Sequence, residues 1–356
     1  MGHGLRMNVG TESMVDVAER SRAVLRPDGA DHLHALRVAV GLLAPAVVLL
    51  AIGRPELMIY AVFGAFTGMY GRGDMGGRKQ LHQLQAAILL TVAVAVGVLL
   101  SQLMVTAWIL VVVVAGFSMA VSVVADVLEL RPVGPFFFLF ALGATAVVPA
   151  GLVEPGVAIA ICAGTAVLAL MVGSVGTSPI GSRTGEFRSL AVPHGAWLHA
   201  ARYGIAIAAA GGVGVFLGFA HANWAMASAA VPLAAMDVGR PQERAVRLVL
   251  SRAAHRVAGT CAGLLVTAMV LAAGLSPSIL AALMVALLFP TELFMVRHYA
   301  VAIGFFTPLI MLMCELTAPT DPLTLVSYRG LDTVIGVVAG VAVAIAVRGR
   351  WYSPRS

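Results

Sequence analysis

Apolar residues fall into long, nearly uncharged runs that are separated by short polar links. Several windows of about 18–20 residues carry almost no charge, which is long enough for a helix to cross a hydrocarbon core of about 30 Å. Strands of a membrane β-barrel would alternate apolar and polar residues, and the runs show no such alternation. We therefore predict an all-α membrane protein with about twelve transmembrane helices. The predicted spans cover residues 35–52, 55–71, 84–104, 106–125, 133–149, 155–175, 198–219, 222–237, 254–274, 277–291, 298–316 and 330–347.

Composition excludes a soluble globular protein. The 356 residues are 60% hydrophobic and 11% charged, with a mean hydropathy of +0.95, whereas a soluble domain has roughly 25% charged residues. The three cysteines, Cys162, Cys261 and Cys314, lie inside apolar runs without any CxxC or Cys/His spacing. Neither a disulfide framework nor a zinc site is therefore indicated, and we expect the thiols to pack as small apolar groups.

The distribution of basic residues orients the predicted bundle. With the N-terminus in the cytoplasm, only Arg54 and Arg329 among the 23 Lys and Arg residues fall on the far side. This positive-inside distribution is typical of a plasma-membrane protein, so the net charge of +6 predicts contact with the lipid bilayer and not with nucleic acid. The first 30 residues lack the apolar stretch of a signal peptide. We expect both termini in the cytoplasm.

The chain repeats itself at about half its length. Residues 33–37 read LHALR and residues 198–202 read LHAAR, an offset of 165 residues. Six spans in each half with the same direction predict two parallel six-helix repeats, an arrangement in which transporters place their site at the repeat interface. The predicted segments are a cytoplasmic tail (1–32), the first repeat (33–175), a cytoplasmic linker (176–196), the second repeat (197–347) and a cytoplasmic tail (348–356).

Two helices of the second half share a motif. Residues 256–263 read RVAGTCAG and residues 329–336 read RGLDTVIG, both of the form R-x-x-[GD]-T-x-x-G. The i, i+4 glycines allow helix backbones to approach closely, while the threonines can bond to their own helix or to a neighbour. A helix-packing seam and a substrate-lining surface both fit this pattern. The residues concerned are Arg256, Gly259, Thr260, Gly263, Arg329, Asp332, Thr333, Gly336 and Gly340.

These stretches resemble a known family of membrane proteins. RAAHRVAGTCAGLL (252–265) resembles the first helix, and YRGLDTVIGVVAG (328–340) the closing helix, of the fusaric acid resistance (FUSC)-like or aromatic acid exporter-like proteins. GRPELMIYAVFGAFTGMYGR (53–72) is similar to bacterial members, so the resemblance covers most of residues 33–347 in two copies. It implies export of small organic acids, aromatic acids among them. The first-half counterpart, HQLQAAILLTVAVAVG (82–97), lacks Gly-Thr-x-x-Gly, so a site built on this motif would be asymmetric.

The loop YGRGDMGGRKQL (70–81) resembles the signature loop of the major facilitator transporters, which are also 6+6 repeats. That signature requires an Arg directly after the Asp, where Met75 stands, and a Gly four residues before it, where Tyr70 stands. We therefore favour a basic anchor with glycine turns. A facilitator-type transporter stays open as an alternative.

Ionisable residues at membrane depth are costly and so are functional candidates. Glu292 could pair with Arg297, and Arg329 with Asp332 at i, i+3. Glu315 and Asp332 lie near the outer ends of their spans, where an outer gate or a proton-accepting carboxylate is the alternative to a local ion pair. Arg37, Arg202 and Arg256 lie at cytoplasmic helix ends, where they either contact lipid headgroups or, together with His255, attract an organic anion.

No catalytic constellation is visible. The sequence has no Walker A motif, no Ser-His-Asp arrangement and no metal-ligand cluster, so we expect neither an enzyme nor a cofactor. Transport would then depend on an ion gradient. A passive organic-anion channel and a non-transporting envelope or assembly protein are the remaining alternatives, and a homo-oligomer is compatible with all of them.

Overall fold

The computed structural model describes residues 29–74, 76–175, 192–193, 195–219, 222–236 and 242–347. Within these ranges the chain forms helices joined by turns and loops, with no strand. Nearly all of the predicted N-terminal tail, most of the linker at 176–196 and the C-terminal tail at 348–356 lie outside the described residues. The all-α prediction is confirmed for the part that the structure describes.

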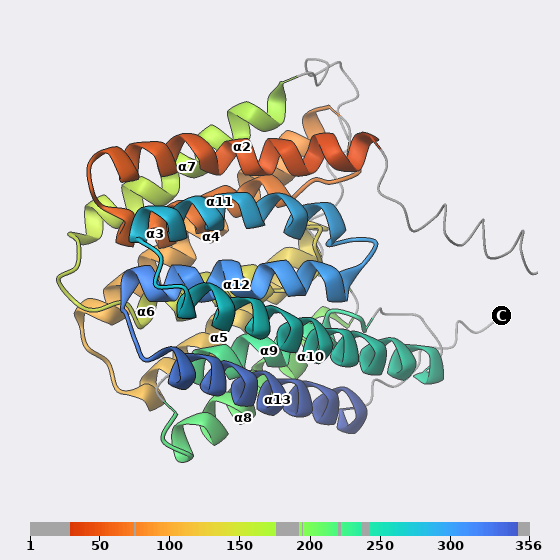
Figure 1. Ribbon diagram of the computed structural model, residues 1–356. Helices are drawn as coiled ribbons and strands as arrows, with labels where there is room; N and C mark the ends of the chain where they lie inside the picture. Colours follow the sequence, from red (N-terminus) through yellow and green to blue (C-terminus); the bar gives the residue numbers. More distant parts are fainter. Residues whose placement is uncertain are drawn as a thin grey trace, which may run out of the picture.

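Twelve α-helices and two 3₁₀ turns account for the described part of the chain, each near one of the predicted apolar runs (Figure 1). Three of the long helices, α7, α11 and α13, begin with a proline, which has no N–H to lose at a helix start. The helices are α2 (Gly29–Ala51), α3 (Met58–Ala65), α4 (Gly77–Gln102), α5 (Ala107–Val127), α6 (Phe136–Ala146), α7 (Pro155–Ser174), α8 (Ala196–Phe216), α9 (Ala222–Leu233), α10 (Gln242–Ala272), α11 (Pro277–Phe294), α12 (Tyr299–Thr317) and α13 (Pro322–Ala346).

Eight of these helices are long and apolar enough to cross a membrane: α2, α4, α5, α7, α10, α11, α12 and α13. The predicted segments 55–71, 133–149 and 222–237 instead contain the short helices α3, α6 and α9. The helix α8 has 21 residues, but its polar first turns, with His199 and Arg202, lower its hydropathy. The structure thus supports a multi-pass helical membrane protein, and the number of twelve spans stays a prediction.

The short helices form the centre of the bundle. Every residue of α3 and α9 is buried, as are nine of the eleven residues of α6. The apolar runs that contain them are interrupted by helix-ending features: 3₁₀ turns flank α3, and Gly134 with a φ of +89° and Pro135 precede α6. Because a protein interior is as apolar as lipid, hydropathy does not distinguish these buried half-helices from full spans.

Longer helices pack around this centre. The helix α2 packs against α3 and α7, and α8 packs against α9 and α13. Similarly, α4 packs against α6 and α7, and α10 against α12 and α13. Contacts between α2 and α11, and between α5 and α8, join the two parts of the chain. Figure 1 shows α2 and α7 along one edge of the bundle and α8 and α13 along the opposite edge.

One end of the bundle gathers the charged loops. Ion pairs link Arg72 and Arg297 to Asp31, and Arg78 to Glu129. These contacts involve the starts of α2 and α4 and the loops at 70–74, 128–135 and 295–298, which we together call the basic end. At the opposite end, Arg54 pairs with Glu56.

Candidate functional site

Two arginines are buried in the helix bundle with unpaired donors. Arg256 on α10 is 0% exposed and Arg329 on α13 is 1% exposed. No group among the described residues accepts a hydrogen bond from Nε, Nη1 or Nη2 of Arg256, or from Nε or Nη1 of Arg329. A buried, unpaired guanidinium is unfavourable because its charge has lost its hydration. Cations in such positions are therefore candidates for a function.

Helix packing brings the two arginines together. The connections at 273–276, 295–298 and 318–321 are short, so α10 to α13 alternate in direction and α10 runs antiparallel to α13. Gly330 of α13 lies against Leu264 of α10, one turn along α10 from Thr260. The Arg329 guanidinium is repelled by Arg256 and attracted by Asp332, so the three charged groups lie near one another.

The carboxylate of Asp332 accompanies the two guanidiniums. Asp332 is 0% exposed, and neither of its carboxylate oxygens has a hydrogen-bond partner among the described residues. The ion pair with Arg329 that the i, i+3 spacing allows is not formed. With all three side chains ionised, two cations and one anion give a formal charge of +1. We call this group of Arg256, Arg329, Asp332 and the neighbouring Thr260 the arginine cluster.

Neutral polar groups beside the cluster are also unpaired. The hydroxyls of Thr260 on α10 and Thr307 on α12, and both side-chain atoms of Asn223 on α9, have no partner among the described residues, and all three residues are buried. Thr333 differs, because its hydroxyl donates to the Arg329 carbonyl at 2.8 Å within its own helix. The unpaired groups add hydrogen-bonding capacity to the arginine cluster.

Aromatic rings face both guanidiniums. Arg256 Cζ lies 5.2 Å from the ring centroid of Phe136, and Arg329 Cζ lies 5.2 Å from that of Trp224. Both distances are within the range of a cation–π contact, which stabilises a cation without using its N–H groups. Phe306 packs 6.2 Å from Phe136 and extends the ring surface. The cluster therefore has an aromatic wall, contributed by α6, α9 and α12.

The motif glycines hold the surrounding helices close. Gly259 and Gly263 of α10 lie against α12, and a Cβ on Gly263 would come within 2.6 Å of Thr307 Cβ. Gly336 and Gly340 of α13 lie against the α9 backbone, where a Cβ on Gly336 would meet Ser228 Cβ at 2.7 Å. These contacts are of the small-residue kind that lets membrane helices approach closely. The same helices carry Arg256 and Arg329.

Two other predicted pathway residues lie apart from the cluster. His255 is exposed, because successive residues of a helix point about 100° apart and Arg256 takes the inward position. Glu315 is half-buried on α12 and accepts a hydrogen bond from the Thr320 backbone N–H at 3.3 Å.

Arg37 and Arg202 bind helix ends at the basic end. Arg37 Nη2 donates to the Val175 carbonyl at 2.7 Å, and Arg202 Nε donates to the Val347 carbonyl at 3.0 Å. Val175 and Val347 are the C-terminal caps of α7 and α13. A cation is favourable there because the last carbonyls of a helix carry partial negative charge. The repeated arginine of LHALR and LHAAR thus serves the same structural purpose twice.

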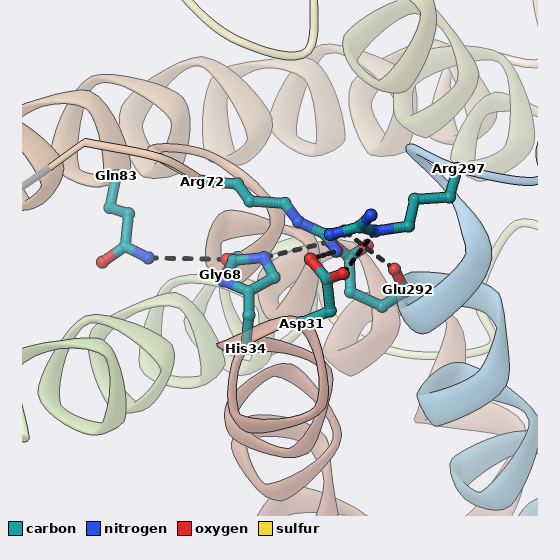
Figure 2. A network of polar contacts seen from close by, with 7 residues as sticks. All are labelled: Asp31, His34, Gly68, Arg72, Gln83, Glu292 and Arg297. Carbon is teal, nitrogen blue, oxygen red and sulfur yellow. Dashed lines mark hydrogen bonds and ion pairs between the residues drawn. The ribbon is translucent and has the colours of Figure 1, made fainter. Parts of the chain in front are cut away.

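Glu292 belongs to a polar network at the basic end, which Figure 2 shows. His34 Nε2 lies 3.0 Å from Glu292 Oε1, and Arg72 Nη1 donates to the Glu292 carbonyl at 2.9 Å. Asp31 accepts from Arg72 at 2.8 Å and from Arg297 at 2.6 Å. The predicted Glu292–Arg297 pair is therefore replaced by a network that joins α2, the loop after α3 and the α11–α12 loop.

A second histidine–carboxylate contact lies at the α5–α8 contact. His199 Nδ1 is 3.5 Å from Asp126 Oδ2, and His199 Nε2 is 3.4 Å from the Leu233 carbonyl. His34 and His199 occupy the same position in LHALR and LHAAR. Each thus meets a carboxylate near the end of a helix from the other part of the chain.

Sequence reasoning missed the two rings that face the arginines and the buried amide of Asn223. Phe136 and Trp224 lie on the short helices and reach the arginines only through packing between distant segments, while Asn223 lies against Gly143 of α6. A signal for Asn223 and Trp224 existed in the sequence, since they stand together at the start of a run of small apolar residues. An amide in such a run indicates a polar contact inside the bundle.

Comparison with known proteins gives one match. Residues 205–343 match the family described as fusaric acid resistance protein-like, and this range contains α9 to α12, most of α8 and α13, and every residue of the arginine cluster. No curated protein and no solved structure matches the chain. The chain is thus a multi-pass helical membrane protein, and its residues 205–343 are similar to the fusaric acid resistance protein-like family.

Proposed function

We propose that the protein is a membrane transporter for small organic anions, which bind between Arg256 and Arg329. The formal charge of +1 and the unpaired guanidinium donors, on residues 0–1% exposed, carry this proposal. A single carboxylate would neutralise the charge and accept the unused hydrogen bonds, since guanidinium groups bind carboxylates through two parallel bonds. Buried charges in membrane proteins commonly mark a substrate or ion pathway.

Aromatic acids are the favoured substrates within this class. The rings of Phe136, Trp224 and Phe306 provide an apolar surface beside the guanidiniums. A substrate ring could pack edge-to-face or offset against these side chains while its carboxylate meets the arginines.

The twelve helices are best understood as two parallel six-helix repeats. The pairings of α2 with α7 and of α4 with α6 recur as α8 with α13 and α10 with α12, and this recurrence supports the proposal. In transporters of this kind the site lies near the middle of the membrane, between the repeats. The position of the arginine cluster beside the central helices α6, α9 and α12 agrees with that expectation.

The basic end is proposed to face the cytoplasm of a plasma membrane, with both chain termini on that side, because basic loops are retained there. Export is then proposed to use an ion gradient, in keeping with the lack of a Walker A motif in the sequence.

Flux into proteoliposomes tests the proposal. Labelled benzoate and a panel of aliphatic carboxylates would be followed with and without an imposed pH gradient, for the wild type and for Arg256→Gln and Arg329→Gln. We expect saturable, gradient-dependent flux in the wild type and a loss of at least about tenfold in each variant, since a charged hydrogen bond contributes roughly 1.5–3 kcal/mol. Arg252→Gln is the matched control, because Arg252 lies on the same helix and stacks over Tyr299 at 3.7 Å.

Two results would change the conclusion. Non-saturating flux that follows the electrical potential without any pH dependence would replace the carrier by an anion channel. Absence of flux for every anion, in protein that remains folded, would refute transport and leave a structural or assembly role.

A further inference from the structure

We propose that Asp332 sets the charge selectivity of the site, so that it accepts organic anions with one negative charge and rejects those with two. This inference rests on the proposed anion transport and names the substrate class of the same site. Its basis is the composition of the arginine cluster, in which two guanidiniums face a single carboxylate and none of the three residues is more than 1% exposed. A monoanion brings the formal charge of the cluster to zero.

A dianion would leave the same cluster with a charge of −1. A buried net charge is unfavourable because little solvent is present to screen it. At an effective dielectric constant of about 20, one unit charge at about 6 Å changes an affinity roughly a hundredfold. Asp332 opposes a dianion twice as strongly as a monoanion, and this difference produces the selectivity.

The charge balance involves only nearby groups. Among the helices packed against α13, α9 contributes neutral polar groups such as Asn223, α10 contributes Arg256, and the buried face of α8 beyond its first two turns is apolar. From α12, the Cys314 thiol interacts with Arg329, while Glu315 is half-buried and bonded to the Thr320 backbone. Asp332 is thus the acidic residue placed to offset the arginines.

The test compares the affinities of purified protein for benzoate and phthalate at neutral pH, where phthalate carries two charges, with butyrate and succinate as a second matched pair. We expect the wild type to prefer the monoanion of each pair. In Asp332→Asn the preference should shift toward the dianion by about a hundredfold. Glu315→Gln, which removes a carboxylate outside the cluster, should keep the wild-type ratio.

A double variant separates charge from packing. Arg329→Gln alone brings the cluster to zero charge and should weaken binding of both anions. By the same rule Arg329→Gln alone should prefer the monoanion more strongly than the wild type does. Adding Asp332→Asn restores +1 and should shift the affinity ratio back toward the dianion by about a hundredfold, which a purely structural role of Asp332 would not produce. The double variant also carries the test if Asp332→Asn, with its charge of +2, fails to fold.

The failures of the two proposals are distinguishable. A wild type that binds anions but prefers the dianion, or an Asp332→Asn variant with an unchanged ratio, would overturn the role of Asp332 and leave anion transport intact. Absence of binding of any of the four anions to folded wild-type protein would overturn both.

Discussion

The helix pairs α4–α7 and α10–α13 have matching places in the two parts of the chain but bury different side chains. Thr91 stands fourteen residues after the first residue of α4, and Arg256 stands fourteen residues after the first residue of α10. In the same way, Cys162 stands seven residues into α7 and Arg329 seven residues into α13. Thr91 and Cys162 are uncharged and lie close enough to interact with each other. Arg256 and Arg329 keep most of their donors unpaired.

This difference shows what the helix packing does and does not need. At the α4–α7 contact the two side chains are neutral, and Thr165 stands there at the position that Asp332 has in α13. Charged side chains are therefore not required for two helices to pack in this way. The unfavourable burial of Arg256 and Arg329 agrees with the proposed anion, which would accept hydrogen bonds from their unpaired N–H groups.

The largest expected effect comes from removing the charges at the α10–α13 contact, so that it becomes neutral like the α4–α7 contact. Arg256→Met, Arg329→Met and Asp332→Asn together keep the side-chain volumes similar and remove all three charges. We expect anion flux to fall to background, while the free energy of unfolding stays the same or rises by about 1–4 kcal/mol, because the desolvation of unpaired charges is avoided. Flux in proteoliposomes and unfolding in detergent measure the two effects.

The matched control changes the α4–α7 contact. Thr91→Val combined with Cys162→Ala should leave flux unchanged and lower the free energy of unfolding by about 1 kcal/mol, because removing the fully buried Cys162 sulfur leaves a small cavity. A triple variant that unfolds several kcal/mol more easily than the wild type would show instead that the arginines maintain the fold.

The sequence predicted the helices better than their roles. Long apolar runs identified every helical segment near its place, because a helix in lipid needs an uninterrupted apolar stretch. The predicted lengths of α3, α6 and α9 were wrong, because the residues that flank these helices, including the buried 3₁₀ turn after α3, are also largely apolar. Hydropathy responds to removal from water and does not report whether lipid or protein is responsible.

The candidate site was predictable only in part. The spacing of Arg256 and Thr260, and of Arg329 and Thr333, placed each pair on one helix face, which is a local property. The unpaired state of the guanidiniums and the rings of Phe136 and Trp224 depend on packing between distant segments. Arg37 shows a different limit, since its position in the sequence indicated contact with lipid headgroups or attraction of an organic anion, and in the structure its side chain binds the end of α7.

The two histidine–carboxylate contacts allow a second comparison, between the α2–α11 and α5–α8 contacts. Glu292 is 2% exposed and holds both His34 and Arg72, so Glu292→Leu should lower the free energy of unfolding by roughly 3 kcal/mol. Asp126 makes a longer contact of 3.5 Å to His199 and is more exposed. Asp126→Leu should therefore lower the free energy of unfolding by at most about 1 kcal/mol. Unfolding of both variants in detergent measures the difference, and equal losses would contradict the ranking.

Glycine packing should produce a smaller loss that depends on position. Gly336 of α13 lies against the α9 backbone, and Gly64 of α3 lies against the α7 backbone. The α9–α13 and α3–α7 pairs have matching places in the two parts of the chain, but the glycine stands on the second helix of one pair and on the first helix of the other. Gly336→Ala and Gly64→Ala should each lower the free energy of unfolding by about 1–3 kcal/mol, because backbone atoms cannot move aside as a side chain can. Gly116 of α5 has open space around it, so Gly116→Ala should be neutral or stabilising by up to about 1 kcal/mol. A loss at Gly116 equal to that at Gly336 would show that backbone flexibility, and not close packing, determines the effect.

The smallest expected effect distinguishes the starts of α7 and α13, which both begin with proline. Hydrogen bonds from the backbone N–H and the hydroxyl of Thr324 hold the pKa of Asp321 below its ordinary value, whereas Glu154 makes no capping bond. A carboxylate whose pKa is lower in the folded than in the unfolded state stabilises the folded state. The stabilisation is fully present when the pH lies above the unfolded pKa of about 3.9, and it is lost as the pH falls through the folded pKa. Asp321→Ala should therefore be slightly less stable than the wild type at neutral pH and equal to it in strong acid, while Glu154→Ala should match the wild type at both. Thermal unfolding of the three proteins across this pH range is the measurement, and a difference for Asp321→Ala that does not change with pH would assign the effect to packing instead of to the capping carboxylate.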